Sequence, residues 1–316
     1  MSRRVLITGG SGFVGQWLTR ALMKRGDTVF AGTLEGPPRV GVLDAQVIAA
    51  THWLTLDTAS DASIRAAVTG SAPDWIVHLA GIAYPPDANA DPVRAFEVNA
   101  LGALRLLTAV ATSARDARVL IIGSADEYGP YPPDRYPLDE TTPLAPRSVY
   151  GSSKAAQELL ALQMWRSAGL QVVCTRSFNH SGAGHADTYL LPALVRRAAA
   201  LPETGGTLLI GNAAPVRDYL HVADVVDAYL LLLDRGTAGE VYNVCSGKGV
   251  SVRQLAEHVL RRLGVRAAIS TDPALSRPSD TPVLIGDNSR LRGATGWSPR
   301  RSIDDIIDDL SHATTR

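Results

Sequence analysis

Short apolar runs alternate with amphipathic stretches of helical length through the first half of the chain. The expected strands are Val5–Thr8, Thr28–Thr33, Trp53–Leu56, Trp75–Leu79, Val119–Ile122 and Gln171–Arg176. The expected helices are Val14–Lys24, Ser60–Thr69, Val93–Ala114 and Val149–Ala168. Alternation of this kind is typical of a parallel sheet covered by helices on both faces. The sequence therefore predicts an α/β fold built on a doubly wound parallel Rossmann sheet.

The pattern changes after about residue 178, where loops lengthen and Pro and Gly become frequent. Short helices are expected there at Leu191–Ala200, Val222–Leu233, Val252–Leu263 and Ile303–Leu310. We expect a dinucleotide-binding domain over 1–178 and a smaller C-terminal substrate domain over 179–316. Part of the second half, near 211–246, is expected to return to the first domain.

A glycine-rich turn follows the first expected strand. Gly9, Gly12 and Gly15 lie in T-G-G-S-G-F-V-G, between that strand and the first expected helix. Such a turn lets backbone amides approach a pyrophosphate, and the helix N-terminus adds a partial positive charge. Because both the strand and the helix are in place, the motif predicts dinucleotide binding rather than a simple tight turn.

Tyr150 and Lys154 stand four residues apart in Y-G-S-S-K at the start of a predicted helix. Positions i and i+4 share a helix face, so the ammonium can lie near the phenol. A nearby cation favours the ionised phenol, whose ordinary pKa is about 10. The pair is thus a candidate acid/base group for a carbonyl or an alcohol. The spacing alone also fits a solvated helix face.

The charge balance argues against a polyanionic partner. Lys plus Arg and Asp plus Glu number 31 each, so no net charge favours nucleic acid or a membrane surface. Cys174 and Cys245 lie in apolar strand-like runs, which suits buried small side chains better than a disulfide or a metal site. No leader and no apolar run near the ~18 residues of a spanning helix is evident. We therefore expect a cytoplasmic protein without a metal.

Together the glycine turn and the Y-G-S-S-K motif resemble the extended short-chain dehydrogenase/reductase family, and the resemblance runs through the chain. It implies that Ser124, at the end of a strand, donates a hydrogen bond to the substrate carbonyl, while Tyr150 is the acid/base and Lys154 the cation that lowers its pKa. The residues implied to hold the cofactor, besides Tyr150 and Lys154, are Gly9, Gly12, Phe13, Val14, Gly15, Thr33, Asp57, Leu79, Ala80, Gly81 and Asn99.

The second half resembles the nucleotide-sugar branch of this family, and within it the GDP-sugar reductases of 4-keto-6-deoxy-mannose. The similar segments are R-S-F-N-H-S-G-A-G from Arg176, G-N-A-A-P-V-R-D-Y from Gly211, Y-N-V-C-S-G from Tyr242 and R-P-S-D-T-P from Arg277. The resemblance implies that Asn179, Arg217 and Arg277 meet the diphosphate of a nucleotide sugar. Guanidinium groups suit that ligand, although each Arg could instead pair with a neighbouring Asp.

Two loop residues depart from the reductase pattern. Ala183 and His185 stand where those reductases have Pro and Gln. His180 is expected to be either a substrate-facing residue or a loop histidine, and His221 to be structural.

The segment Ser124–Gly129 separates reduction from elimination. Related 4,6-dehydratases carry the motif Thr-Asp-Glu-x-Tyr-Gly or Thr-Ser-Glu-x-Tyr-Gly. Elimination needs the Glu and the preceding Asp or Ser as base and acid. Here Ala125 replaces the Asp or Ser, and Asp126 replaces the Glu with a shorter side chain. We therefore expect a reductase of a 4-keto nucleotide sugar. A dehydratase using Asp126, a 4-epimerase that retains its cofactor, and a non-enzymatic dinucleotide sensor remain alternatives.

The turn after the second strand bears on the choice of cofactor. Thr33 occupies the position of an NAD-binding Asp, and Leu34 that of an Arg that would hold a 2′-phosphate. Thr33 does not repel a phosphate, so NADP(H) is expected, with NAD(H) open because Glu35 lies about 20 residues past Gly15. The resemblance also implies a homodimer through the helices Val93–Ala114 and Val149–Ala168.

Overall fold

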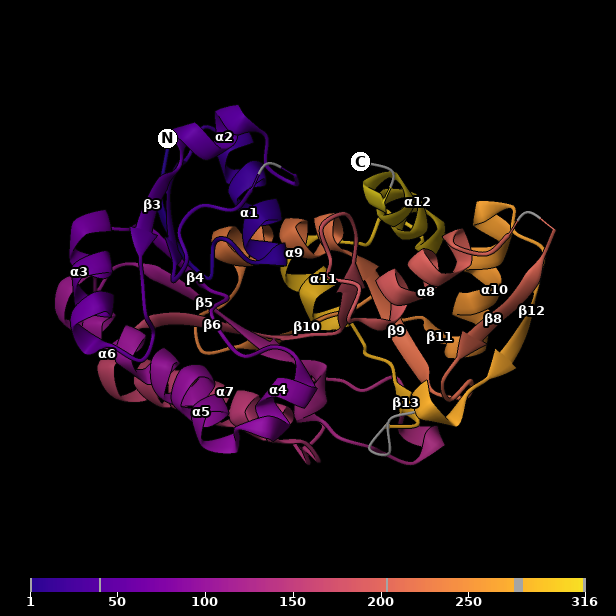
Figure 1. Ribbon diagram of the computed structural model, residues 1–316. Helices are drawn as coiled ribbons and strands as arrows, with labels where there is room; N and C mark the ends of the chain where they lie inside the picture. The colour runs from indigo at the N-terminus through magenta and orange to yellow at the C-terminus, as the bar shows by residue number, and fades with distance from the viewer. Residues whose placement is uncertain (1, 40, 203, 276–280, 315–316) are drawn as a thin grey trace.

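The computed structural model describes residues 2–39, 41–202, 204–275 and 281–314. Figure 1 shows two lobes, the first around a large sheet and the second built mainly from the last third of the chain. The large sheet has seven strands, all parallel to their neighbours. Their order across the sheet is β10 (Val241–Val244), β6 (Gln171–Ser177), β5 (Arg118–Ser124), β4 (Trp75–His78), β1 (Arg4–Thr8), β2 (Thr28–Thr33) and β3 (His52–Thr55). The predicted α/β fold with a parallel Rossmann sheet is confirmed.

Helices cover both faces of this sheet, as Figure 1 shows. On one face lie α1 (Phe13–Lys24), α9 (Val222–Arg235) and α11 (Ser289–Thr295). On the other lie α3 (Asp61–Ser71), α6 (Gly102–Ser113) and α7 (Val149–Ala168). Apart from the partly exposed edge strand β3, the strands are buried on both sides, which explains why they are continuous apolar runs without alternation.

The second lobe has its own apolar core between helices and small sheets. Its helices are α8 (Leu190–Ala199), α10 (Val252–Leu263) and α12 (Ile303–Thr314). One sheet joins β7 (Asn179–Ser181), β9 (Val216–His221), β11 (Gly249–Ser251) and β13 (Val283–Leu284), and a second pairs β8 (Gly206–Ile210) with β12 (Ala267–Thr271). Between these elements the chain returns to the first lobe through α9 and β10.

The expected helix Val93–Ala114 is interrupted in the structure. It consists of α5 (Pro92–Phe96), a π-helical turn Glu97–Leu101 and α6, preceded by α4 (Pro85–Ala90). The short helix α2 (Ala45–Ala50), capped by Asp44, was not expected. The turns Ala125–Glu127, Pro133–Arg135 and Pro273–Leu275 are 3-10 helices.

The run Pro92–Ser113 is also long and apolar enough to span a membrane, contrary to the sequence expectation that no run approaches this length. Half of its most apolar window is buried inside the protein, and α6 packs between α3 and α7. Those contacts are the ones a core helix makes. Length and composition alone are therefore weak evidence for membrane insertion here.

Candidate active site

The glycine-rich turn lies at the carboxyl end of β1, where it enters α1. Gly9 has φ +72°, a conformation that side chains other than glycine rarely adopt. A Cβ on Gly15 would lie 2.4 Å from the Gly9 carbonyl oxygen, and one on Gly9 would lie 2.9 Å from the Ala80 nitrogen. At Gly9 and Gly15 the turn therefore has no room for a side chain, and the backbone segments pack closely against one another. This cradle fits the pyrophosphate of a nicotinamide dinucleotide.

The loop after β4 packs against that turn. The Thr8 hydroxyl lies 2.8 Å from Nδ1 of His78 and accepts a hydrogen bond from the Ala80 amide. His78 is fully buried, and burial, reinforced by the charge of Lys154, lowers its pKa to about 3. The segment Leu79–Gly81 is thereby fixed beside the glycine turn, where the family resemblance placed it.

The π-helical turn Glu97–Leu101 aims Asn99 at the same loop. Its Oδ1 accepts from the Ile82 amide at 2.8 Å, and its Nδ2 donates to the Ser153 hydroxyl at 2.9 Å. A Cβ on Gly81 would lie 2.8 Å from that Oδ1. Asn99 thus joins the cofactor loop to the helix that carries Tyr150 and Lys154. π-turns of this kind are frequent at functional sites.

Thr33 and Asp57 lie at the carboxyl ends of neighbouring strands. The Thr33 hydroxyl is 2.8 Å from the Ser11 hydroxyl of the glycine turn and accepts from the Glu35 amide. Leu34 beside it is 66% exposed. Asp57 accepts from the Ala59 amide. Thr33 therefore presents a neutral hydroxyl to the glycine turn. The carboxylate of Asp57 lies after the next strand, β3, where it accepts from its own loop.

Ser124 and Tyr150 come together at the carboxyl end of β5. Ser124 ends β5, and Ser148 caps α7 so that Tyr150 falls in the first turn. The side chains of Ser124 and Tyr150 share a hydrogen bond. Burial and the nearby charge of Asp126 raise the pKa of Tyr150 above its ordinary value, while this hydrogen bond opposes the rise.

Lys154 is buried one helical turn further along α7. Its Nζ donates to the Ile122 carbonyl at 2.7 Å and to Gln157 Oε1 at 3.0 Å. Burial lowers the pKa of this ammonium to about 8, and the charge of Glu127 opposes that shift. The sequence predicted that Lys154 would lower the pKa of Tyr150. In this structure burial dominates, and the pKa of Tyr150 is raised.

Asp126 and Glu127, adjacent in sequence, point to different places. Glu127 is fully buried, and its Oε1 accepts from the Ser124 amide at 2.6 Å. Burial, and then the charge of Glu158, raise the pKa of Glu127 well above its usual range. Asp126 is half-buried, and its charge acts on Tyr150. Asp126, which the sequence offered as a base for elimination, is thus the carboxylate whose charge acts more strongly on Tyr150.

Of the residues expected to meet the diphosphate, Asn179 and Arg217 lie on the neighbouring strands β7 and β9. Asn179 begins β7 two residues after Ser177, which pairs with Ser124 across the sheet. Its carboxamide makes no hydrogen bond to any described residue. Nη1 of Arg217 donates to the carbonyls of Val216 and Thr281. Arg277 lies outside the described residues.

The alternative reading that Arg217 pairs with Asp218 receives no support. Asp218 is buried and instead accepts from the Ser246 amide, the Ser246 hydroxyl and the Gly247 amide. It therefore shapes the turn after β10. Within the described residues no group of three or more His, Cys, Asp or Glu side chains could hold a metal ion.

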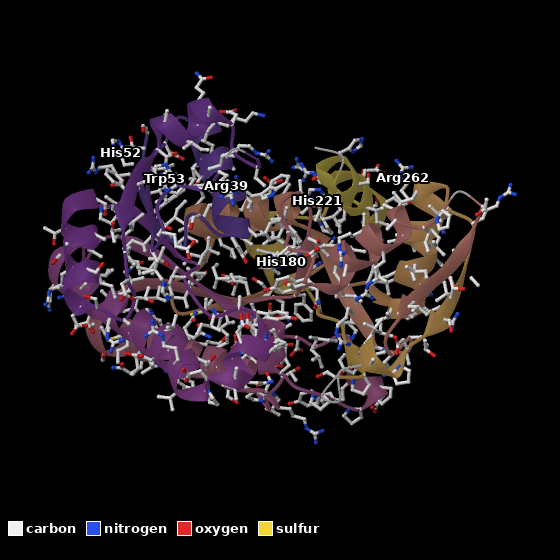
Figure 2. All side chains as sticks on the ribbon, viewed as in Figure 1. Arg39, His52, Trp53, His180, His221 and Arg262 are labelled. Carbon is white, nitrogen blue, oxygen red and sulfur yellow. The ribbon has the colours of Figure 1, made fainter. Side chains whose placement is uncertain are left out.

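Sequence reasoning missed an aromatic group beside the glycine turn. The rings of Phe13 and His185 are stacked at 4.5 Å, His185 lies 4.3 Å from Tyr189, and His180 is parallel to Phe13 at 6.3 Å. Figure 2 shows His180 between the two lobes. The unusual His185 was the available signal, but its stacking partner is far away in the sequence.

The fold and this site define a nicotinamide-dependent enzyme of the nucleotide-sugar class. The chain belongs to the GDP-mannose 4,6 dehydratase family, whose model matches residues 6–310.

Individual relatives within the family cover nearly the whole chain. The chain is 35% identical over 305 residues to GDP-6-deoxy-D-mannose reductase of Pseudomonas aeruginosa, covering 96% of this chain and 94% of that protein. The structure of RMD from P. aeruginosa complexed with NADPH is similar with a TM-score of 0.84 and 31% identity over 100% of both chains. The Thermus thermophilus UDP-glucose 4-epimerase complex with NAD gives 0.85 and 27% identity over 99% of both chains.

Proposed function

We propose that the protein reduces the 4-keto group of a nucleotide-linked 4-keto-6-deoxy sugar with NAD(P)H, converting GDP-4-keto-6-deoxy-mannose to GDP-D-rhamnose. The observation that carries the proposal is that Ser124 ends β5 while Tyr150 and Lys154 lie at the start of α7, where Lys154 donates to the Ile122 carbonyl of the same strand. The similarity to the GDP-6-deoxy-D-mannose reductase of P. aeruginosa supports the choice of sugar and base.

Each residue of the group has a role in such a reduction. A nicotinamide held beside this group would supply the hydride that reduces C4. The Ser124 hydroxyl holds the carbonyl oxygen, and Tyr150 gives its proton to that oxygen as the C4–H bond forms, which leaves a phenolate. Lys154 stabilises the phenolate until a proton from solvent restores the phenol. The high pKa of Tyr150 keeps it protonated at neutral pH, as a proton donor must be.

For the cofactor we propose a preference for NADP(H). Thr33 places a neutral hydroxyl, paired with Ser11, where a carboxylate would repel a 2′-phosphate. The structural relative that carries NADPH supports this choice, whereas the epimerase relative carries NAD.

Elimination is the second candidate function. The charge of Asp126 acts on Tyr150, and the matching family is named after a GDP-mannose 4,6 dehydratase. We rank it lower because Ala125 supplies neither the acid nor the hydroxyl that elimination requires next to its base. Cofactor stoichiometry with purified protein distinguishes the two reactions. A reductase consumes one NAD(P)H per sugar, and a dehydratase consumes none.

We further propose that the first lobe, residues 1–178 with returns near 211–246, binds the cofactor, and that the rest of 179–316 binds the nucleotide sugar.

We also propose a homodimer through the α5–α6 stretch and α7. Large apolar side chains are exposed on these helices: Val93, Phe96, Leu101 and Leu159. A row of this kind on adjacent helices is typical of an association surface. Light scattering should give a mass near twice 33.5 kDa, and Val93→Glu combined with Leu159→Glu should lower it to 33.5 kDa.

A further inference from the structure

The segment Gly182–Tyr189 joins the end of β7 to α8, and its first half touches both α1, which follows the glycine turn, and the loop after β2. His185 stacks on Phe13, the first residue of α1, with 4.5 Å between ring centroids and 9° between ring planes. A Cβ on Gly184 would lie 2.3 Å from Cγ2 of Val42, in the loop between β2 and α2. Nε1 of Trp17 in α1 donates to the Ala183 carbonyl at 2.9 Å. The segment therefore contacts both the start of α1 after the glycine turn and the loop between β2 and α2.

The other end of the segment reaches the loop after β4. The ring of Tyr189 lies 4.3 Å from that of His185 and packs edge-on against Tyr84 at 5.3 Å. Tyr84 follows β4, on the first lobe. The phenol of Tyr189 also adds, as the last of several causes, to the raised pKa of Tyr150. His185 and Tyr189, from the loop that leads into the second lobe, are thus held between Phe13 and Tyr84 of the first lobe.

Local contacts fix the imidazole in the stacked position. Nδ1 of His185 lies 2.9 Å from the Ser181 hydroxyl, and the His185 amide donates to the Gly182 carbonyl. Burial lowers the pKa of His185 to about 3, with a further contribution from His180. The imidazole is therefore neutral at working pH. Its contact with Phe13 is stacking of two neutral rings rather than a charge effect.

We propose that His185 is a positioning residue that fastens the segment Gly182–Tyr189 over the bound nicotinamide dinucleotide. The cofactor then leaves only after the stack on Phe13 has opened. The same stack connects the glycine turn, through Tyr189, to Tyr84 after β4. The inference rests on the cofactor alone and holds whichever nucleotide sugar is reduced.

The test measures dissociation of NADPH in the absence of sugar, by stopped flow, with energy transfer from tryptophan to the reduced nicotinamide as the signal. His185→Ala removes both ring contacts and should raise the dissociation rate about tenfold. His185→Phe keeps a ring between Phe13 and Tyr189 and loses only the Ser181 hydrogen bond. Its rate should stay within about threefold of the wild-type rate. Melting temperatures of both variants establish that each is folded.

His52 offers a matched control. Its ring is stacked on Phe30 at 4.8 Å with 18° between planes, and Figure 2 shows it far from His180, on the outer side of the first lobe. His52→Ala should leave NADPH dissociation unchanged. Wild-type dissociation in His185→Ala would overturn the proposal. So would a rate in His185→Phe as fast as in His185→Ala, or an equal acceleration in His52→Ala.

Discussion

The Ser124 amide donates a hydrogen bond to the buried carboxyl group of Glu127, with 2.6 Å between the Ser124 nitrogen and Oε1. The carboxyl group has no exposed surface, and its Oε2 finds no hydrogen-bond partner in the described structure. Such a group is costly to bury as an anion, which agrees with its raised pKa. Glu127 therefore affects the catalytic group in two ways. It holds the Ser124 amide by a hydrogen bond, and its charge, when ionised, raises the pKa values of Tyr150 and Lys154.

Replacing Glu127 tests this arrangement. Glu127→Gln keeps an oxygen that can accept from the Ser124 amide, so we expect turnover within about tenfold of wild type. Glu127→Ala leaves that amide buried without a partner and should lower the free energy of unfolding by about 1–3 kcal/mol. Denaturant unfolding and steady-state kinetics of both variants provide the comparison. A Gln variant as damaged as the Ala variant would show that the hydrogen bond is not what matters.

Tyr150→Phe should lower the turnover number by about 10²–10⁴-fold. The hydroxyl is the proton donor, whereas the ring and the surrounding binding surface remain. Nucleotide-sugar affinity, measured by calorimetry in the presence of oxidised cofactor, should change by no more than about threefold. Near-normal turnover would end the assigned mechanism.

Lys154→Met should raise the apparent pKa of the catalytic group in the pH–rate profile and weaken cofactor binding. The cation favours the phenolate, and by family resemblance it holds the nicotinamide ribose. An unchanged profile together with unchanged cofactor affinity would contradict both roles.

The same variant has a stability signature. The pKa of Lys154 is lowered to about 8 in the folded protein from an ordinary 10.5. Between these values the unfolded chain binds more protons, so this group makes the wild type more stable as pH rises from 8 to 10.5. In the wild type, Lys154 should therefore raise the free energy of unfolding by about 2–3 kcal/mol between pH 8 and pH 10.5. Lys154→Met lacks the titrating group and should not show this increase. Urea unfolding at the two ends of the window measures it.

The sequence allowed the sheet and the glycine turn between β1 and α1 to be predicted, because each depends on local periodicity or a short motif. The catalytic roles of Ser124, Tyr150 and Lys154 stay predictions. The π-turn at Asn99 could not be predicted, since one extra residue in a helical turn leaves the apolar pattern almost unchanged. That Glu127 is buried while Asp126 is only half-buried could not be predicted either, because it depends on which side of a 3-10 turn faces the core. The stack of His185 on Phe13 depends on tertiary packing between distant segments.

Thr33→Asp should shift cofactor preference from NADP(H) towards NAD(H) by at least roughly tenfold. A carboxylate there repels the 2′-phosphate and can accept from the ribose hydroxyls. Thr33→Val removes the contact with Ser11 without adding charge, and it should shift the preference far less. The ratio of kcat/KM for the two cofactors is the measurement. A wild type that already prefers NAD(H) would overturn the interpretation and make Glu35 the residue to test.

The direction of the reaction is the decisive prediction. Given a 4-keto-6-deoxy nucleotide sugar, the protein should consume one NAD(P)H per sugar and form a 4-hydroxy product. Given GDP-mannose alone it should do little, because Ala125 leaves Asp126 without the partner that elimination needs. Mass spectrometry of the sugar together with absorbance of the reduced cofactor follows both reactions.

Asp126→Asn sharpens the distinction between the two reactions. Asp126 raises the pKa of Tyr150 through its charge, so the amide should lower the apparent pKa of the catalytic phenol and leave reduction within about tenfold of wild type. Were the enzyme a dehydratase, the amide would remove the base for the C5 proton and abolish product. Steady formation of a 4-keto sugar from GDP-mannose without net use of cofactor, lost in Asp126→Asn and retained in Glu127→Gln, would identify Asp126 as that base and replace the reductase assignment.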